Sequence, residues 1–260
     1  MNFGLCGAFD LLELAEKIGF DYLELKVTEI AGWPEEVFEA NRRKIRESKV
    51  ACDCFNVLFP GDLALLGPEA DEKRRVEYLR FAFDRLKRLE GSIVVFGSGR
   101  ARRKPQTESF FNAYRELVCV TRQIGNLAAE YGLTIVIEPL NRKECDLINS
   151  MAEGALLVSD TGLDNVRLLS DFYHVATDGE PLEDLTRIGA FSHIHIASKE
   201  GRRYPLPGQP DDYLQFFRRL KETGYNSRVS IEGSSEDILE DGVKSLAYLK
   251  KLWENAVFTQ

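Results

Sequence analysis

The chain has 260 residues, of which 44% are hydrophobic and 29% are charged, and its formal net charge is -8. This length allows a sizeable core, and the acidic balance disfavours a general nucleic-acid-binding protein. No apolar run approaches the roughly 18 residues of a membrane span, so we expect no membrane partner. The odd count of five cysteines and an N-terminus without a basic leader predict reduced thiols and a cytoplasmic location.

Strand-like and helix-like segments alternate along the chain. The expected strands cover residues 3–6, 22–26, 51–56, 93–97, 134–138, 166–171, 192–196 and 228–232. Amphipathic segments of helical period lie at 10–19, 34–49, 71–90, 106–132, 182–189, 211–223 and 235–255, and a capping box at 150–153 opens a further short helix. Eight strands alternating with helices favour an α/β fold, a single eight-stranded parallel β/α barrel formed by residues 1–260 as one domain.

A doubly wound sheet is the alternative fold. Such a sheet usually carries a glycine-rich loop after its first strand, and Gly-Ala-Phe-Asp at residues 7–10 lacks the dinucleotide fingerprint. The Gly-Ser-Gly run at residues 97–99 is only a fragment of that fingerprint, and we interpret it as a tight turn.

Four of the expected strands, the fifth to the eighth, end in a residue that can bind a metal. A charged or imidazole side chain at the end of a buried strand is costly unless it has a partner. In β/α barrels, active sites lie at the C-terminal ends of the strands, so these four ends share one face. The set suits one divalent cation such as Mn, Mg, Co or Zn, and it consists of Glu138, Asp171, His195 and Glu232.

The motifs around these residues resemble the xylose-isomerase-like barrel superfamily, and within it the branch of the D-tagatose and D-psicose epimerases. The resemblance covers nearly the whole chain and implies a metal-dependent sugar isomerase or epimerase. It implies that the four strand-end residues ligate the metal. It rests on Ile-Glu-Pro-Leu-Asn-Arg-Lys-Glu at 137–144, Asp-Phe-Tyr-His at 171–174, His-Ile-His-Ile-Ala at 193–197 and Ser-Ile-Glu-Gly at 230–233.

The same resemblance implies that Glu138 and Glu232 are the catalytic acid and base. Two carboxylates on opposite sides of a sugar can remove a proton beside a carbonyl and return it to the other face, through an enediolate. The resemblance also implies that Glu144 and His174 hold substrate hydroxyls. Arg202 would contact the oxygen next to the reacting carbon.

The loop at residues 202–210 departs from the family pattern. It is longer than usual, and Pro210 stands where a second glycine is common, so Arg203 remains an alternative to Arg202. We interpret His193, two residues before a predicted ligand, as a hydrogen-bonded core histidine one layer deeper. A basic cluster after the fourth strand, which is either a solvated loop or an anion contact, contains Arg100, Arg102 and Arg103.

Several functional alternatives remain open at this point. An inosose-type dehydratase would use the same scaffold and much of the same ligand set. A DNA-repair endonuclease of the superfamily is disfavoured, because such enzymes resemble a histidine-rich three-metal site and this chain has three histidines. A non-catalytic sugar-binding protein would not need both glutamates. The identity of the sugar, its phosphorylation, the native metal and any homo-oligomer are not specified by the sequence.

Overall fold

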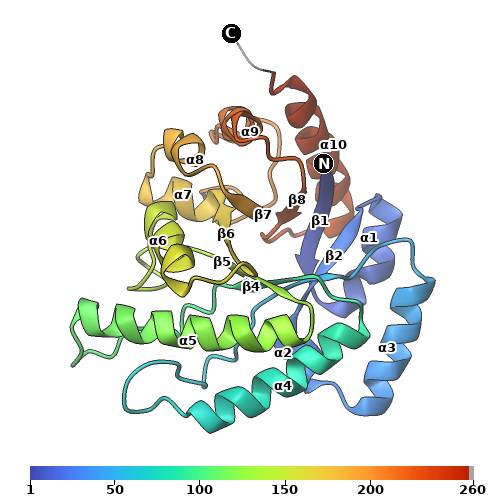
Figure 1. Ribbon diagram of the computed structural model, residues 1–260. Coiled ribbons are helices and arrows are strands. Elements are labelled where there is room, and N and C mark those ends of the chain that lie inside the picture. The colour runs from blue at the N-terminus through green and yellow to red at the C-terminus, as the bar shows by residue number, and fades with distance from the viewer. Residues whose placement is uncertain (258–260) are drawn as a thin grey trace.

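The computed structural model describes residues 1–257, in which eight parallel strands close into a barrel in the order β1 to β8 (Figure 1). The predicted α/β barrel is therefore confirmed. Every neighbouring pair of strands is parallel, and β1 closes the ring by pairing with β8. The strands are β1 (Asn2–Gly7), β2 (Tyr22–Lys26), β3 (Cys54–Asn56), β4 (Ile93–Phe96), β5 (Thr134–Ile137), β6 (Val166–Asp171), β7 (Phe191–Ile196) and β8 (Arg228–Ile231).

Helices surround the barrel, as Figure 1 shows most clearly for α3, α4 and α5. Among residues 1–257, no helix combines the length and apolarity that crossing a membrane requires. The helices are η1 (Phe9–Leu11), α1 (Leu12–Ile18), α2 (Val27–Gly32), α3 (Glu35–Glu47), α4 (Glu72–Arg88), α5 (Phe110–Glu130), α6 (Met151–Thr161), α7 (Phe172–Asp178), α8 (Glu183–Ile188), α9 (Tyr213–Glu222) and α10 (Ile238–Asn255).

Two short helices, α2 and α7, were not predicted from the sequence. Each begins directly after a strand and has six or seven residues, which is too short for a clear helical period. The expected strand at 51–56 is also shorter, because Ala51 makes only an isolated bridge to Tyr22 and regular pairing starts at Cys54. The predicted capping box does form, since the Ser150 hydroxyl accepts a hydrogen bond from the backbone N–H of Glu153.

Strand alternation sorts the side chains into an outer and an inner set. Outward residues such as Leu23 and Ile194 pack against the helices in the main hydrophobic core. Inward residues two apart along each strand form layers inside the barrel. Glu24 and His193 lie one layer below the C-terminal mouth, together with the small apolar cluster of Val95, Val136 and Leu169. The layer at the mouth consists of Cys6, Lys26, Asn56, Gly97, Glu138, Asp171, His195 and Glu232.

Candidate metal centre and active site

The four predicted metal-binding side chains meet at the mouth of the barrel. One ligand atom from each of Glu138, Asp171, His195 and Glu232 lies within 4.8 Å of the others. His195 Nδ1 lies 3.4 Å from Glu138 Oε1 and 3.1 Å from Glu232 Oε2. Asp171 and His195 are partners in the register of β6 and β7, whereas the two glutamates directly follow β5 and β8. The strand ends therefore converge as the sequence predicts.

A glycine beside the quartet makes room for one of its carboxylates. Gly97 follows β4, and a Cβ at that position would lie only 2.0 Å from Glu138 Oε2. Any larger residue would push the Glu138 carboxylate out of its present place. The Gly-Ser-Gly turn noted in the sequence thus shapes the wall of the site.

The buried polar atoms at this mouth that have no hydrogen-bond partner include Glu138 Oε1 and His174 Nε2. Buried polar atoms are nearly always paired in native proteins, so an unpaired carboxylate oxygen here indicates a missing ligand. Burial and the charge of Glu232 raise the pKa of Glu138, and burial raises the pKa of Asp171 to about 7. A divalent cation would offset this crowding of negative charge, and the oxygen-rich donor set fits a hard cation.

A carboxylate that the sequence analysis missed lies directly beneath His195. Glu24 on β2 is completely buried, and its Oε1 lies 2.9 Å from His195 Nε2. Ser230 donates a hydrogen bond of 2.5 Å to the other oxygen of Glu24, from which His193 Nε2 lies 2.8 Å away. His193 is therefore the deeper core histidine predicted from the sequence. The available signal was an acidic residue between Leu23 and Leu25, at an inward position of a buried strand.

The charges of this buried group are mutually stabilising. Burial lowers the pKa of His195, but the charge of Glu24 outweighs it, and the resulting pKa is well above the ordinary value. Burial likewise raises the pKa of Glu24, whereas the charges of His195 and His193 outweigh it and hold that pKa well below the ordinary range. Because Nε2 of His195 faces Glu24, Nδ1 is the nitrogen left to face the other three side chains of the quartet.

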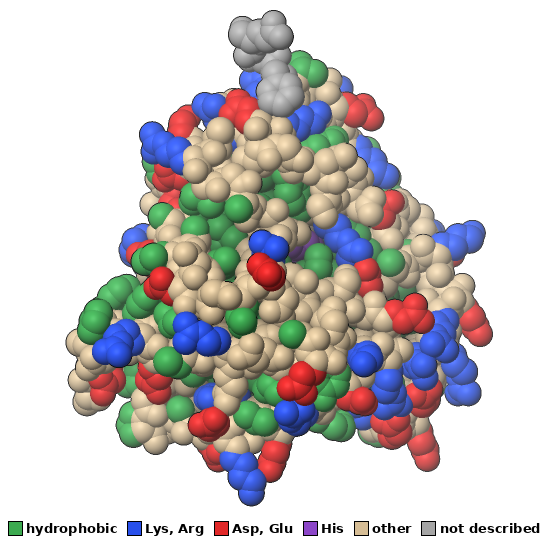
Figure 2. All heavy atoms as spheres, in the orientation of Figure 1, with side chains coloured by type: hydrophobic (Ala, Val, Ile, Leu, Met, Phe, Trp, Pro, Cys, Tyr) green, Lys and Arg blue, Asp and Glu red, His purple; other side chains and the backbone are tan. Residues whose placement is uncertain are grey.

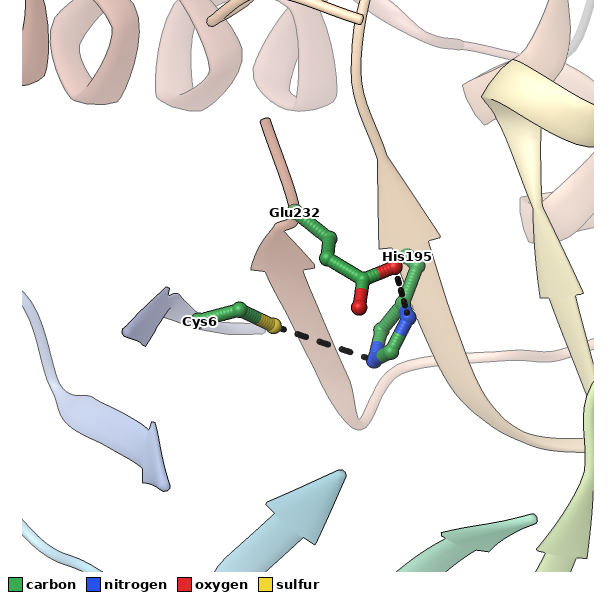
Figure 3. A group of neighbouring side chains, drawn as sticks. All are labelled: Cys6, His195 and Glu232. Carbon is green, nitrogen blue, oxygen red and sulfur yellow. Dashed lines mark hydrogen bonds and ion pairs between the residues drawn. The ribbon is translucent and has the colours of Figure 1, made fainter. Parts of the chain in front are cut away.

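Cys6 also faces this histidine, as Figure 3 shows for the side chains that point toward each other from β1, β7 and β8. Its Sγ lies 3.9 Å from His195 Nε2, and burial raises the pKa of the Cys6 thiol well above its usual value. Cys6 is half-buried at the mouth, where it stays a neutral thiol.

His174 is placed by α7 and is held in one orientation by Asn141. Its Nδ1 lies 3.1 Å from the backbone N–H of Asn141 and 2.8 Å from the side-chain amide, both of which donate. Burial lowers the pKa of His174 to about 3, so the ring is neutral and carries its proton on Nε2. That N–H points toward Asp171, at 3.5 Å. The amide of Asn141 also donates to Glu144 at 2.9 Å.

Of the two candidate arginines, Arg202 is the one at the site. Its guanidinium lies 2.5 Å from Glu232 Oε2 and 3.4 Å from Asp171 Oδ2, and it stacks on the ring of Tyr173. Arg203 is exposed and pairs with Glu236 away from the mouth. The φ angle of Arg202 is 46°, a left-handed conformation that is uncommon outside glycine and that occurs at functional sites.

The basic cluster after β4 does not form a shared anion site. Arg102 is completely buried and donates hydrogen bonds to the backbone carbonyls of Phe96, at 3.1 Å, and Glu138, at 2.8 Å. Arg100 and Arg103 are exposed, and Arg103 donates to the carbonyl of Glu144. Arg102 therefore fixes the end of β5 rather than facing a ligand, and the anion-contact interpretation is wrong for Arg102.

The fold and this mouth define a β/α barrel with a carboxylate-rich candidate metal centre. The family model for the xylose isomerase-like TIM barrel matches residues 12–252, and the chain belongs to this family. An L-ribulose 3-epimerase of Mesorhizobium japonicum is 25% identical over 253 residues, which span 94% of this chain and 78% of that protein.

Solved structures show the same architecture. A D-allulose 3-epimerase from Methylomonas sp. superposes with a TM-score of 0.86 at 20% identity, covering 97% of this chain and 98% of that one. The IOLI protein, solved with a bound zinc atom, has a TM-score of 0.74 at 21% identity and matches over 100% of both chains. The relatives are epimerases and isomerases of the tagatose epimerase-like branch, which confirms the resemblance seen in the sequence motifs.

Proposed function

We propose that this protein is a divalent-metal-dependent sugar epimerase or isomerase that moves a proton beside the carbonyl of a ketose. The observation that carries the proposal is the convergence of Glu138 and Glu232 on one nitrogen of His195 from strands on opposite sides of the mouth. The names of the relatives support the same reaction class.

The candidate holders of the metal are Glu138, Asp171, His195 and Glu232. The unpaired Glu138 oxygen and the hard donor set support this assignment. When bound, such a cation would polarise the substrate carbonyl and hydroxyl oxygens as a Lewis acid. Mn, Mg, Co and Zn all suit the donor set, and the native ion is left to measurement.

Proton transfer falls to the two glutamates. A sugar lying across the mouth would present opposite faces to Glu138, after β5, and to Glu232, after β8. One carboxylate would remove the proton from carbon and the other would return a proton to the opposite face, which inverts that centre. An aldose–ketose isomerase would use the same pair to move the proton between adjacent carbons.

Three further side chains are proposed to hold the substrate. The Nε2–H of His174 is a donor without a hydrogen-bond acceptor and is positioned by Asn141. Glu144 accepts from Asn141 through Oε1 and lies 3.5 Å from Arg202 through Oε2, and its carboxylate has lone pairs left to accept from a substrate hydroxyl. Arg202 provides a fixed cation beside the reacting centre, where it would stabilise negative charge that develops on a substrate oxygen.

The test is a substrate screen with purified protein loaded in turn with Mn, Mg, Co and Zn. Free and phosphorylated ketoses are incubated, and the products are separated from their epimers and isomers. Epimer or aldose formation supports the proposal, whereas loss of water from a keto-inositol would identify the dehydratase alternative. Metal content of the wild type and of His195→Ala is measured in parallel. Equal metal content in both would remove His195 from the ligand set.

A further inference from the structure

A cavity of about 320 Å³ opens beside the metal quartet, on the side of β1, β2, β3 and β8. It shares Arg202 and Glu232 with the candidate active site, so a molecule bound at the quartet would extend into it. Its volume lies at the lower end of the range for small-molecule sites. Figure 2 shows a small area of histidine near the centre of one face, beside Lys or Arg side chains. The remaining lining of the cavity includes Cys6, Lys26, Asn56 and Ser234.

Lys26 and Asn56 are placed in this cavity by the strands themselves. They are register partners on β2 and β3, and both stand at inward positions of their strands. Tyr22 and Glu24, four and two residues before Lys26, also point into the barrel, as their contacts with Ser230 show. The Lys26 ammonium is therefore presented at the rim of the mouth rather than on the outer surface of the barrel.

The charges in the cavity leave the ammonium of Lys26 without a counter-charge. Arg202 has Glu232 as an ion-pair partner. Within residues 1–257, no carboxylate oxygen lies within 4 Å of Lys26 Nζ, although the chain carries a net charge of -8. An unpaired cation at the rim of a polar cavity attracts an anionic ligand group.

A second observation points to a ligand in the same place. Asn56 is only 2% exposed, and its side-chain amide donates a hydrogen bond of 3.1 Å to Glu232. Its Oδ1 is buried without a partner. A buried acceptor of this kind costs free energy unless a donor reaches it, and a sugar hydroxyl is such a donor. The cavity thus offers one unpaired acceptor and one unpaired cation, side by side.

We propose that this cavity binds the part of the substrate remote from the metal, and that Lys26 selects substrates with an anionic group at that end. Asn56 Oδ1 accepts a hydrogen bond from a neighbouring hydroxyl. The inference rests on the proposed sugar epimerase or isomerase function and narrows its substrate class to sugar acids or sugar phosphates. A carboxylate and a phosphate would both satisfy Lys26, and the experiment separates them.

The first experiment measures binding without turnover. Calorimetry on the metal-loaded protein compares glucitol with gluconate and with glucitol 6-phosphate, for the wild type and for Lys26→Gln. The wild type should bind one anionic ligand at least tenfold more tightly than glucitol, and Lys26→Gln should lose that preference. Lys26→Arg should keep it. Equal affinity of the wild type for all three ligands would overturn the proposal.

A matched control separates a specific contact from a general change in charge. Lys143 is exposed in the loop after β5, on the same face of the barrel but outside the cavity lining. Lys143→Gln makes the same charge change as Lys26→Gln and should leave the preference for the anion intact. An equal loss in both variants would show long-range electrostatics only, and would also overturn the proposal.

The second experiment measures turnover and distinguishes this inference from the proposed function. Lys26→Gln should raise KM about tenfold or more for an anionic ketose and leave KM for the neutral ketose unchanged. If the protein turns over neutral ketoses and Lys26→Gln changes KM for no substrate, the anion subsite is refuted. The proposed function is then retained. Lys26-dependent binding of anions without turnover of any sugar would refute the proposed function and retain the anion subsite.

Discussion

His195 Nε2 lies 2.9 Å from Oε1 of Glu24, a carboxylate that is completely buried one layer below the mouth. A histidine that binds a metal through one nitrogen usually donates its other N–H to such an acceptor, which fixes the tautomer and the ring plane. Glu24 thus acts through His195 and is a positioning residue. It connects the polar interior of the barrel with the candidate metal centre.

The first prediction concerns this contact. Glu24→Gln keeps the size of the side chain but removes its charge, so His195 should lose its fixed orientation. Affinity for Mn should fall by about 10–100-fold, measured by calorimetry, with the ¹⁵N shifts of the His195 ring reporting a change of tautomer. Glu77→Gln, on the exposed face of α4, is the control and should change neither quantity. Unaltered affinity and ring shifts in Glu24→Gln would remove Glu24 from this role.

A second prediction uses the close approach at Gly97. Gly97→Ala places a Cβ 2.0 Å from Glu138 Oε2, so the carboxylate must rotate away. Affinity for the cation should drop at least tenfold, while the melting temperature changes little because the end of a side chain can move. Gly32→Ala on α2 is the control, since a Cβ there meets no atom within 4 Å. A Gly97→Ala protein with wild-type cation affinity would contradict the proposed position of Glu138.

The outline of this site was predictable from the sequence, because ligand-type residues at four strand ends converge whenever the strands close a barrel. Glu144, His174 and Arg202 were predicted only through the family resemblance, and all three lie at the mouth. What could not be predicted depends on the register between distant strands. For example, the register between β2 and β3 brings Lys26 beside Asn56, although the two residues are far apart in the sequence.

Arg102 is a second residue whose contacts could not be predicted from the local sequence. Its neighbours in the sequence suggested a solvated or anion-binding cluster, but the side chain turns inward to the carbonyls of Phe96 and Glu138. Neither contact of Arg102 can be predicted from the local sequence, because both depend on where β4 and β5 end.

The third prediction concerns the contribution of the buried Arg102 side chain to stability. Arg102→Met leaves the buried carbonyl of Glu138 without a donor, whereas the carbonyl of Phe96 keeps a hydrogen bond of 3.3 Å from the backbone N–H of Glu138. One such loss costs about 1–3 kcal/mol, so the free energy of unfolding should fall by roughly that amount. Arg103→Met removes an exposed arginine and should stay within about 0.5 kcal/mol of the wild type. Urea unfolding measures both variants. An Arg102→Met protein as stable as Arg103→Met would restore the interpretation of a solvated cluster.

A fourth prediction concerns pH and a group outside the active site. Burial raises the pKa of Glu180 to about 7, and its carboxylate accepts a hydrogen bond from the backbone of Met151. Because the folded-state pKa exceeds the ordinary value of about 4.3, the folded protein keeps a proton that the unfolded chain releases. Glu180 therefore contributes stability at low pH that is lost as the pH rises from about 4 to about 7.

Glu180→Gln removes this cost of ionisation while keeping an acceptor for Met151. The variant should be more stable than the wild type above pH 7, by on the order of 1 kcal/mol after allowance for the partial exposure of the group. The difference should vanish near pH 4. Thermal unfolding of both proteins across this range checks the sign, and a constant difference at every pH would contradict the raised pKa of Glu180.

Glu138 and Glu232 are proposed to move a substrate proton between carbon and solvent. Glu138→Gln and Glu232→Gln each keep the size and one oxygen of the side chain but cannot transfer the proton. Each should lower kcat by about 10²–10⁴-fold while substrate still binds. Glu144→Gln is the comparison, because it changes a proposed hydroxyl contact and should raise KM more than it lowers kcat.

The most direct measurement is turnover of the best ketose in D₂O, followed by NMR of the product. Proton transfer by two opposed carboxylates predicts deuterium at the carbon beside the carbonyl, because a carboxylate proton exchanges with solvent between removal and return. Product formed at the normal rate without deuterium at that carbon would contradict the two-glutamate mechanism and would point to a hydride shift instead.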